Sequence, residues 1–138
     1  MTTAIDTNVL VALWDTDPQL NSAVHKALDS AQARGALVIT GAVYAKLLAL
    51  PGRTEKMLDE FFGATGILVE WQLSEQIWRT AGRAFQEYAR RHSKKKAEMP
   101  RRILADFLIG AHAAVHHYPL LTLDRRLYRA AFPKLKIV

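Results

Sequence analysis

The sequence predicts an α/β fold with a short-stranded parallel sheet that is covered by helices on both faces. Short apolar runs alternate along the chain with longer segments in which apolar residues recur every three or four positions. The short runs are apolar throughout instead of alternating with polar residues, which is typical of strands buried on both faces. Glycine, proline and capping residues separate the segments, so each helix and strand has a predicted start and end.

In the first half of the chain, turn and cap residues mark each element. Asp17-Pro18 is a helix start, Gly35 a helix stop, and Thr40 a helix cap, while Pro51-Gly52 ends another helix. The predicted elements are a strand at 2–5, helices at 9–14 and 18–34, a strand at 36–39, helices at 43–50 and 54–62, and a strand at 67–69.

The second half continues the alternation of helix and strand. Ser74 opens a long helix whose apolar stripe includes Ile77, Trp78 and Ala81, and Pro100 marks the next helix start. The predicted elements are a helix from 74 into the basic segment at 90–96, a helix from 100 to 118, a strand at 120–121, a helix at 124–132 and an edge strand at 135–138.

Length and composition indicate one cytoplasmic domain spanning residues 1–138. Half of the 138 residues are hydrophobic, which is enough for one core and too few residues for two domains. The longest apolar run, Val9 to Trp14, is far too short to span a bilayer, and Asp6 interrupts any signal-peptide core, so no membrane is expected. The absence of cysteine fits a reducing compartment.

The positive charge indicates an anionic partner, with nucleic acid as the leading candidate. The net charge is +6 and the isoelectric point is about 9.8, and basic side chains bind phosphates with release of counterions. The alternative to nucleic-acid binding is that these basic residues form only a solvated charge run. Much of the excess positive charge, however, lies in the segment that leads directly into Asp106. The residues concerned are Arg90, Arg91, Lys94, Lys95, Lys96, Arg101 and Arg102, with Arg125 and Arg126 further along.

Three aspartates at the ends of apolar runs are the candidate metal ligands. Asp6 and Asp124 follow predicted parallel strands, whose carboxyl ends share one edge of the sheet, and Asp106 lies near the start of a helix. Buried carboxylates are costly unless they are paired, and hard cations such as Mg²⁺ or Mn²⁺ prefer oxygen ligands. The structural alternatives to metal binding are that Asp106 is a carboxylate favoured at the start of a helix and that Asp124 is a helix N-cap.

Two further patterns have competing interpretations. His112 and His116 are four residues apart and could bind a metal on one helix face, but the sequence offers no obvious third ligand. Several large apolar residues are expected in the core, or lining a groove for a partner helix: Trp14, Leu47, Leu50, Leu58 and Phe62.

Four segments of the chain resemble the successive motifs of PIN-domain ribonucleases, with VapC-type toxins of toxin-antitoxin pairs as the closest branch. They begin at Ile5-Asp6-Thr7-Asn8, Ile39-Thr40-Gly41, Asp106-Phe107-Leu108 and Leu121-Thr122-Leu123-Asp124. The resemblance implies an α/β/α sandwich and an endoribonuclease that depends on Mg²⁺ or Mn²⁺. It also implies an RNA substrate, a cognate antitoxin and a homodimer. Asp6, Asp106 and Asp124 match acidic site positions, and Asn8 and Thr122 match supporting positions.

Lys46 departs from the family pattern. It occupies the position where the family usually has its second acidic residue, a glutamate, so the local charge differs by two units. Its ammonium could take a cation position among the aspartates and weaken or abolish catalysis. Natural loss of activity and a substitution selected or engineered to allow production of a toxic chain both explain it, and a third interpretation is that Lys46 points to solvent. The alternative function is a PIN-like module that binds an antitoxin or RNA without cleavage.

Overall fold

The described residues of this computed structural model, 1–92 and 103–138, form a four-stranded parallel sheet. The strand order is β3-β2-β1-β4. The strands are β1 (Thr3–Ile5), β2 (Leu37–Thr40), β3 (Leu68–Glu70) and β4 (Leu120–Leu121). Every pairing in this sheet is parallel, so the carboxyl ends of β1 and β4, which are neighbours, lie at the same edge. The predicted α/β class and parallel sheet are therefore confirmed.

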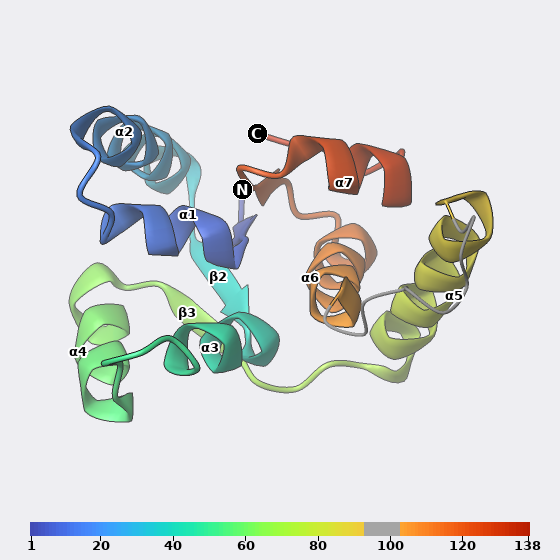
Figure 1. Ribbon diagram of the computed structural model, residues 1–138, viewed down its shortest axis with the longest axis horizontal. Coiled ribbons are helices and arrows are strands. Elements are labelled where there is room, and N and C mark those ends of the chain that lie inside the picture. Colours follow the sequence, from blue (N-terminus) through green and yellow to red (C-terminus); the bar gives the residue numbers. More distant parts are fainter. Residues whose placement is uncertain (93–102) are drawn as a thin grey trace.

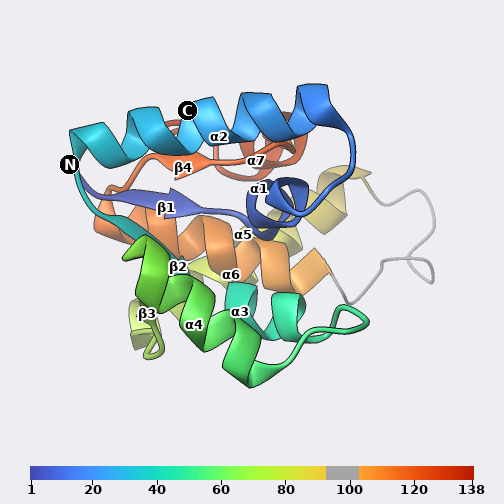
Figure 2. The same ribbon diagram turned by 90° about the vertical axis from the view of Figure 1, so that its left-hand side faces the viewer.

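Helices connect the strands and cover both faces of the sheet. In the described residues they are α1 (Thr7–Leu13), α2 (Pro18–Arg34), α3 (Gly41–Leu48), α4 (Glu55–Thr65), α5 (Glu75–His92), α6 (Ile103–His116) and α7 (Arg125–Ala131). Figure 1 shows α1, α2 and α4 on one side of the strands and α5 and α6 on the other. Figure 2, turned by 90°, shows α2 and α4 in front of the sheet and α6 behind it. The arrangement is the α/β/α sandwich implied by the resemblance.

Two helices start earlier than the sequence predicts, because the helix cap is the last residue of the preceding strand or the residue directly after it. Asp6 accepts a hydrogen bond from the Thr7 backbone N–H (2.7 Å), so α1 begins without the predicted turn. Thr40 accepts a hydrogen bond from the Val43 N–H (3.4 Å), which confirms it as a cap, but α3 starts directly at Gly41. Strand and helix are thus joined by single polar residues at this edge of the sheet.

The predicted edge strand at 135–138 is present only as an isolated parallel bridge between Leu120 and Ile137. Leu120 donates its N–H to the Lys136 carbonyl (2.8 Å) and accepts from the Val138 N–H (2.9 Å). Since β4 has only two residues, it offers little backbone with which a further strand could pair. The carboxyl-terminal segment therefore continues the sheet by a single bridge.

The core lies between the sheet and its helices. Leu47, Leu58 and Phe62 are buried, and Trp14 and Leu50 pack partly buried against the core, which confirms the core interpretation of these residues. Trp78 is 55% exposed, whereas its predicted stripe partners Ile77 and Ala81 are buried. The mismatch arises because neighbouring residues on a helix point about 100° apart, so Trp78 turns away from Ile77. No described helix has the length and apolar character needed to cross a bilayer.

Gly110 allows α6 to approach the segment after α7. A Cβ atom placed on Gly110 would lie 2.4 Å from a ring carbon of Phe132, which is itself buried. We expect Gly110→Ala to lower the free energy of unfolding by about 1–3 kcal/mol, because the ring must shift in a packed core.

Gly63→Ala in α4 is the matched control, since a Cβ atom at Gly63 would meet no other atom within 4 Å and alanine favours a helix by about 1 kcal/mol. Urea unfolding of both variants measures the difference. Equal stability of the two variants would show that Phe132 does not constrain α6.

Candidate functional site

Asp6 is a buried carboxylate at the carboxyl end of β1. It is only 3% exposed. One of its oxygens accepts from the Thr7 N–H (2.7 Å) and the other accepts from the Thr122 hydroxyl (2.8 Å). These two donors come from α1 and from the residue after β4, so the parallel pairing of β1 with β4 brings them together. Both hydrogen bonds stabilise the ionised form and fix the orientation of the carboxylate.

Thr122 and Asn8 join the ends of β1 and β4 in one network. The Thr122 hydroxyl oxygen accepts from the Asp124 N–H (2.9 Å) while its proton is donated to Asp6. Asn8 donates its side-chain amide to Thr122 (3.5 Å) and accepts from the Leu123 N–H (3.1 Å). The residues predicted to support the site therefore position the loop that carries Asp124.

Asp106 lies in the first turn of α6 and forms an ion pair with Lys46. The Lys46 Nζ atom is 2.8 Å from an Asp106 carboxylate oxygen, and the side chains are 38% and 24% exposed. Lys46 comes from the last turn of α3, so this ion pair joins the segments that contain the second and third motifs. The ammonium thus faces the acidic residues, and the interpretation of Lys46 as a solvent-directed lysine is wrong.

Asp124 caps α7 and lies near a buried tyrosine. Its carboxylate accepts from the Leu127 N–H (3.4 Å), so the predicted N-cap role is present. Tyr128 is 1% exposed, and burial together with the charges of Asp6, Asp106 and Asp124 raises the pKa of its hydroxyl. All three predicted carboxylates are thus close enough to one phenol to disfavour its ionisation. Within the described residues the Tyr128 hydroxyl has no hydrogen-bond partner of good geometry.

The electrostatics of the site centre on Asp6. Burial raises its pKa above the ordinary value of 3.8, and the neighbouring charge of Asp106 raises it further. The hydrogen bonds from Thr122 and Thr7 and the charge of Lys46 act in the opposite direction, but burial dominates. A cation near Asp6 would favour the charged form of its carboxylate. In the described residues, however, Asp6, Asp106 and Asp124 are not a group whose ligand atoms all lie within 4.8 Å of one another.

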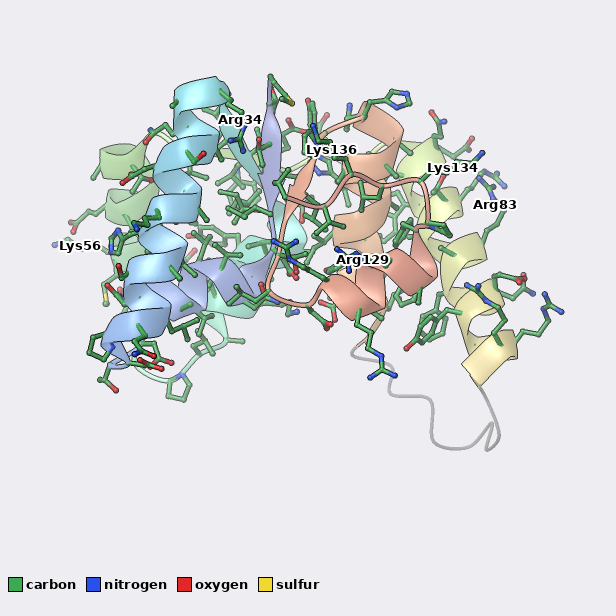
Figure 3. All side chains as sticks on the ribbon, turned by 90° about the horizontal axis from the view of Figure 1, so that it is seen from above. Arg34, Lys56, Arg83, Arg129, Lys134 and Lys136 are labelled. Atoms are coloured by element: carbon green, nitrogen blue, oxygen red, sulfur yellow. The ribbon has the colours of Figure 1, made fainter. Side chains whose placement is uncertain are left out.

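Only part of the predicted RNA-binding set falls on described residues. Lys94, Lys95, Lys96, Arg101 and Arg102 lie outside them. Arg125, beside Asp124, and Arg126 are exposed at the start of α7. Arg90 and Arg91 pair with Glu87 in α5, and Arg91 also donates to the Ala130 carbonyl (2.8 Å). Figure 3 labels further basic residues on several elements, among them Arg83 on α5 and Arg129 on α7.

Two residues of chemical interest were not found from the sequence. Tyr128 could have been found by its spacing, because residues i and i+4 of a helix share a face and Tyr128 follows the cap Asp124 by four. Glu70 ends β3 much as Asp6 follows β1, and its carboxylate lies 2.7 Å from His112 and 4.0 Å from His116. The predicted histidine pair thus acquires an acidic neighbour from another element.

Comparison with known families gives one decisive result. A family model described as PIN domain matches residues 3–133. The chain belongs to the PIN domain family. PIN domains are generally nucleases, which is the broad class of chemistry expected of Asp6, Asp106 and Asp124, the residues that we call the acidic edge. A comparison with curated proteins gives no match.

Solved structures share this PIN fold over nearly the whole chain. VapBC2 from Rickettsia felis bound to a DNA fragment from their promoter has a TM-score of 0.73 at 19% identity, covering 100% of this chain and 98% of that one. FitAcB from Neisseria gonorrhoeae has a TM-score of 0.65 at 25% identity, with coverages of 99% and 96%. A toxin-antitoxin complex from Klebsiella pneumoniae has a TM-score of 0.63 at 17% identity, with coverages of 96% and 94%.

The buried charge of Asp6 should reduce stability. Because burial raises its pKa in the folded chain above that in the unfolded chain, its contribution to stability falls as the pH rises through these two values, and the cost is complete only above the folded pKa. We expect Asp6→Asn to raise the free energy of unfolding at pH 7 by about 1 kcal/mol. An amide oxygen can still accept one of the two hydrogen bonds.

Urea unfolding from pH 3 to pH 7 measures this effect, and the gain should shrink toward pH 3. Asp29→Asn, at an exposed position in α2, is the matched control and should leave stability nearly unchanged. A pH-independent loss of stability in Asp6→Asn would mean that the hydrogen bonds of the carboxylate outweigh its burial.

Proposed function

We propose that this PIN domain is a VapC-type toxin, a metal-dependent endoribonuclease, whose activity is weakened or abolished by Lys46. Membership of a family that consists largely of nucleases supports the enzyme class. The observation that carries the proposal is the ion pair of Lys46 with Asp106 beside the buried Asp6. The ion pair supports the view that a positive charge is favoured beside these aspartates, and the Lys46 ammonium supplies that charge.

The side chains at this edge fit a hard divalent cation. Asp6, Asp106 and Asp124 provide the oxygen ligands that Mg²⁺ and Mn²⁺ prefer, and they come from separate segments, which leaves room for water and a phosphate. A bound ion would supply Lewis-acid activation of water for attack on an RNA phosphodiester. Thr7 and Thr122 hold the Asp6 carboxylate in one orientation, and Asn8 fixes the loop that carries Asp124.

Lys46 opposes cation binding in two ways. Its ammonium occupies one oxygen of Asp106, which is then less available as a ligand. Its charge also repels an incoming cation, and at a partly exposed site this repulsion is reduced but not removed by solvent. The Asp6 oxygens keep their hydrogen bonds to Thr7 and Thr122 beside the ion pair. The chain thus carries three of the four acidic residues that the resemblance implies, and Lys46 stands where family members usually contribute a glutamate.

A non-catalytic module that binds an antitoxin or RNA is the second candidate. The same ion pair favours it, because Lys46 gives the acidic edge a stable arrangement without metal. Under this function the fold would serve only to present a surface that binds the antitoxin or RNA. The two candidates differ in whether a divalent ion binds among the three aspartates.

The proposed partners are an RNA substrate, a cognate antitoxin protein and a second copy of the chain. The solved toxin-antitoxin complex from Klebsiella pneumoniae, which shares this fold, supports an antitoxin. Exposed large apolar side chains offer surface for a protein partner: Leu68 on β3, Trp71 after it, and Trp78 on α5. The exposed pair Arg125 and Arg126 beside Asp124 supports the approach of an RNA backbone to the acidic edge.

Replacing Lys46 by glutamate tests the proposed function. Lys46→Glu should produce Mg²⁺- or Mn²⁺-dependent cleavage of a labelled RNA, and divalent-ion affinity should rise by roughly tenfold or more, because the change replaces a repelling charge by an attracting one. Without metal the new carboxylate faces Asp106, so the melting temperature should fall and recover when Mn²⁺ is added.

Lys56→Glu is the matched control, since it makes the same charge change at an exposed position in α4, well away from α7 (Figure 3). It should remain inactive. Lys46→Glu combined with Asp6→Asn should lose the cleavage again, which excludes a contaminating nuclease. If Lys46→Glu binds Mn²⁺ no more tightly and cleaves no faster than the parent chain, the non-catalytic module is the better account.

RNA binding should depend on salt through basic residues of the chain. Neutralising Lys94, Lys95 and Lys96 together should weaken RNA affinity and reduce the slope of log K against log salt by about 0.7 for each phosphate that is no longer neutralised. Arg125→Ala should reduce the slope by the amount expected for a single phosphate.

Arg83→Ala on α5 is the control, because Arg83 is exposed and lies on a different helix from Arg125 (Figure 3). Fluorescence anisotropy at several salt concentrations measures both the affinity and the slope. An unchanged slope in the triple lysine variant would make that segment a solvated charge run.

A further inference from the structure

Glu70, His112 and His116 form a second polar cluster, and its two histidines lie on the same helix as Asp106. One ligand atom of each residue lies within 4.8 Å of the other two. Glu70 comes from the end of β3, and both histidines come from the last turns of α6. Asp106 and His112 are six residues apart, about 9 Å along the helix axis, and they point in different directions around it. The cluster is therefore separate from the acidic edge.

We propose that Glu70, His112 and His116 bind a transition-metal ion of the Zn²⁺ class. Two imidazoles and one carboxylate are a ligand set that suits Zn²⁺ and leaves a fourth position open, whereas Mg²⁺ prefers oxygen ligands alone. The Glu70 and His116 side chains are 31% and 41% exposed, so an ion and a water molecule can reach the site from solvent. The ion would tie the edge strand β3 to the end of α6.

The distances are close to those of a metal site. Tetrahedral zinc ligands at about 2.0–2.1 Å from the ion lie roughly 3.3 Å from one another. The Glu70 carboxylate oxygen is 2.7 Å from the His112 ring nitrogen and 4.0 Å from that of His116. A movement of the partly exposed Glu70 side chain by less than about 1 Å would equalise these distances. His112, which is 1% exposed, stays fixed and provides the rigid part of the site.

Neighbouring groups hold two of the ligands in place. Tyr118 donates its hydroxyl to the other Glu70 oxygen at 3.5 Å, and its ring stacks on His116 with centroids 5.0 Å apart and planes at 14°. Such interactions with the outer atoms of ligands orient them and strengthen binding. The His112 Nδ1 atom, however, has no partner in the described part of the chain. Since metal binding at Nε2 moves the ring proton to Nδ1, we expect micromolar affinity instead of the tighter binding of fully supported zinc sites.

A simple hydrogen bond between His112 and Glu70 is the competing explanation of this cluster. That bond explains the 2.7 Å distance but gives no role to His116, which lies at the longer distance and is not needed for it. His116 is also exposed, so its removal should not disturb the core. His116→Ala therefore separates the metal site from the hydrogen bond.

The test is titration of the full chain, first freed of metal with a chelator, with Co²⁺ and then Zn²⁺. Co²⁺ should give visible absorption bands of a four-coordinate ion, and Zn²⁺ should displace it at one equivalent. Zn²⁺ should also raise the melting temperature by several degrees. Excess Mg²⁺ should not displace either ion, which separates this site from the acidic edge.

Variants decide which residues hold the ion. His116→Ala and Glu70→Gln should each weaken Zn²⁺ binding by roughly tenfold or more and remove the thermal shift, because each removes one of three ligands. The exposed His25→Ala on α2 should bind as the parent chain does. Unchanged Zn²⁺ affinity in His116→Ala, or the absence of saturable binding in the parent chain, would overturn the proposal. Neither outcome depends on RNA cleavage, so the metal site stands or falls independently of the proposed nuclease.

Discussion

The buried carboxylate of Asp6 is the constraint on which the candidate site depends. A charged group with 3% exposure is tolerated only if its oxygens are occupied, and here the two oxygens take donors from two different parts of the chain. One donor is the backbone of α1, and the other is the Thr122 hydroxyl after β4. Pairing β1 with β4 in parallel is what brings these donors together. The same requirement therefore joins the ends of β1 and β4 and caps α1.

The pair of Lys46 and Asp106 places a positive charge at the candidate site within an intact framework of hydrogen bonds. Both side chains keep partial access to water, so the ion pair adds little to stability and costs little to form. Its effect is local, because an ammonium reduces the negative charge that would attract a divalent ion. The surrounding framework of Thr7, Thr122 and Asn8 keeps its hydrogen bonds beside this ion pair.

Helix α6 links the two candidate sites. Its first turn carries Asp106, its last turns carry the two histidines, and Gly110 between them allows close packing against Phe132. The two sites have different ligand chemistry: carboxylate oxygens at the amino end of the helix, and imidazoles with one carboxylate toward the carboxyl end. Hard and borderline metal ions should therefore distinguish them.

The sequence alone predicts the α/β class, most helices and strands and the cap at Thr40, because local patterns of apolar spacing and capping dictate these features. The role of the three aspartates as metal ligands stays a prediction. The tertiary structure alone decided which side chains meet. Nothing local to Lys46 indicates that its ammonium reaches Asp106, since 60 residues separate them and the ion pair requires α3 to lie against α6. The same holds for Glu70, which becomes a neighbour of His112 only when α6 packs against the sheet in which β3 lies beside β2. Trp78 is exposed because it points away from Ile77 on α5, and the last strand is reduced to a bridge because β4 has only two residues with which to pair.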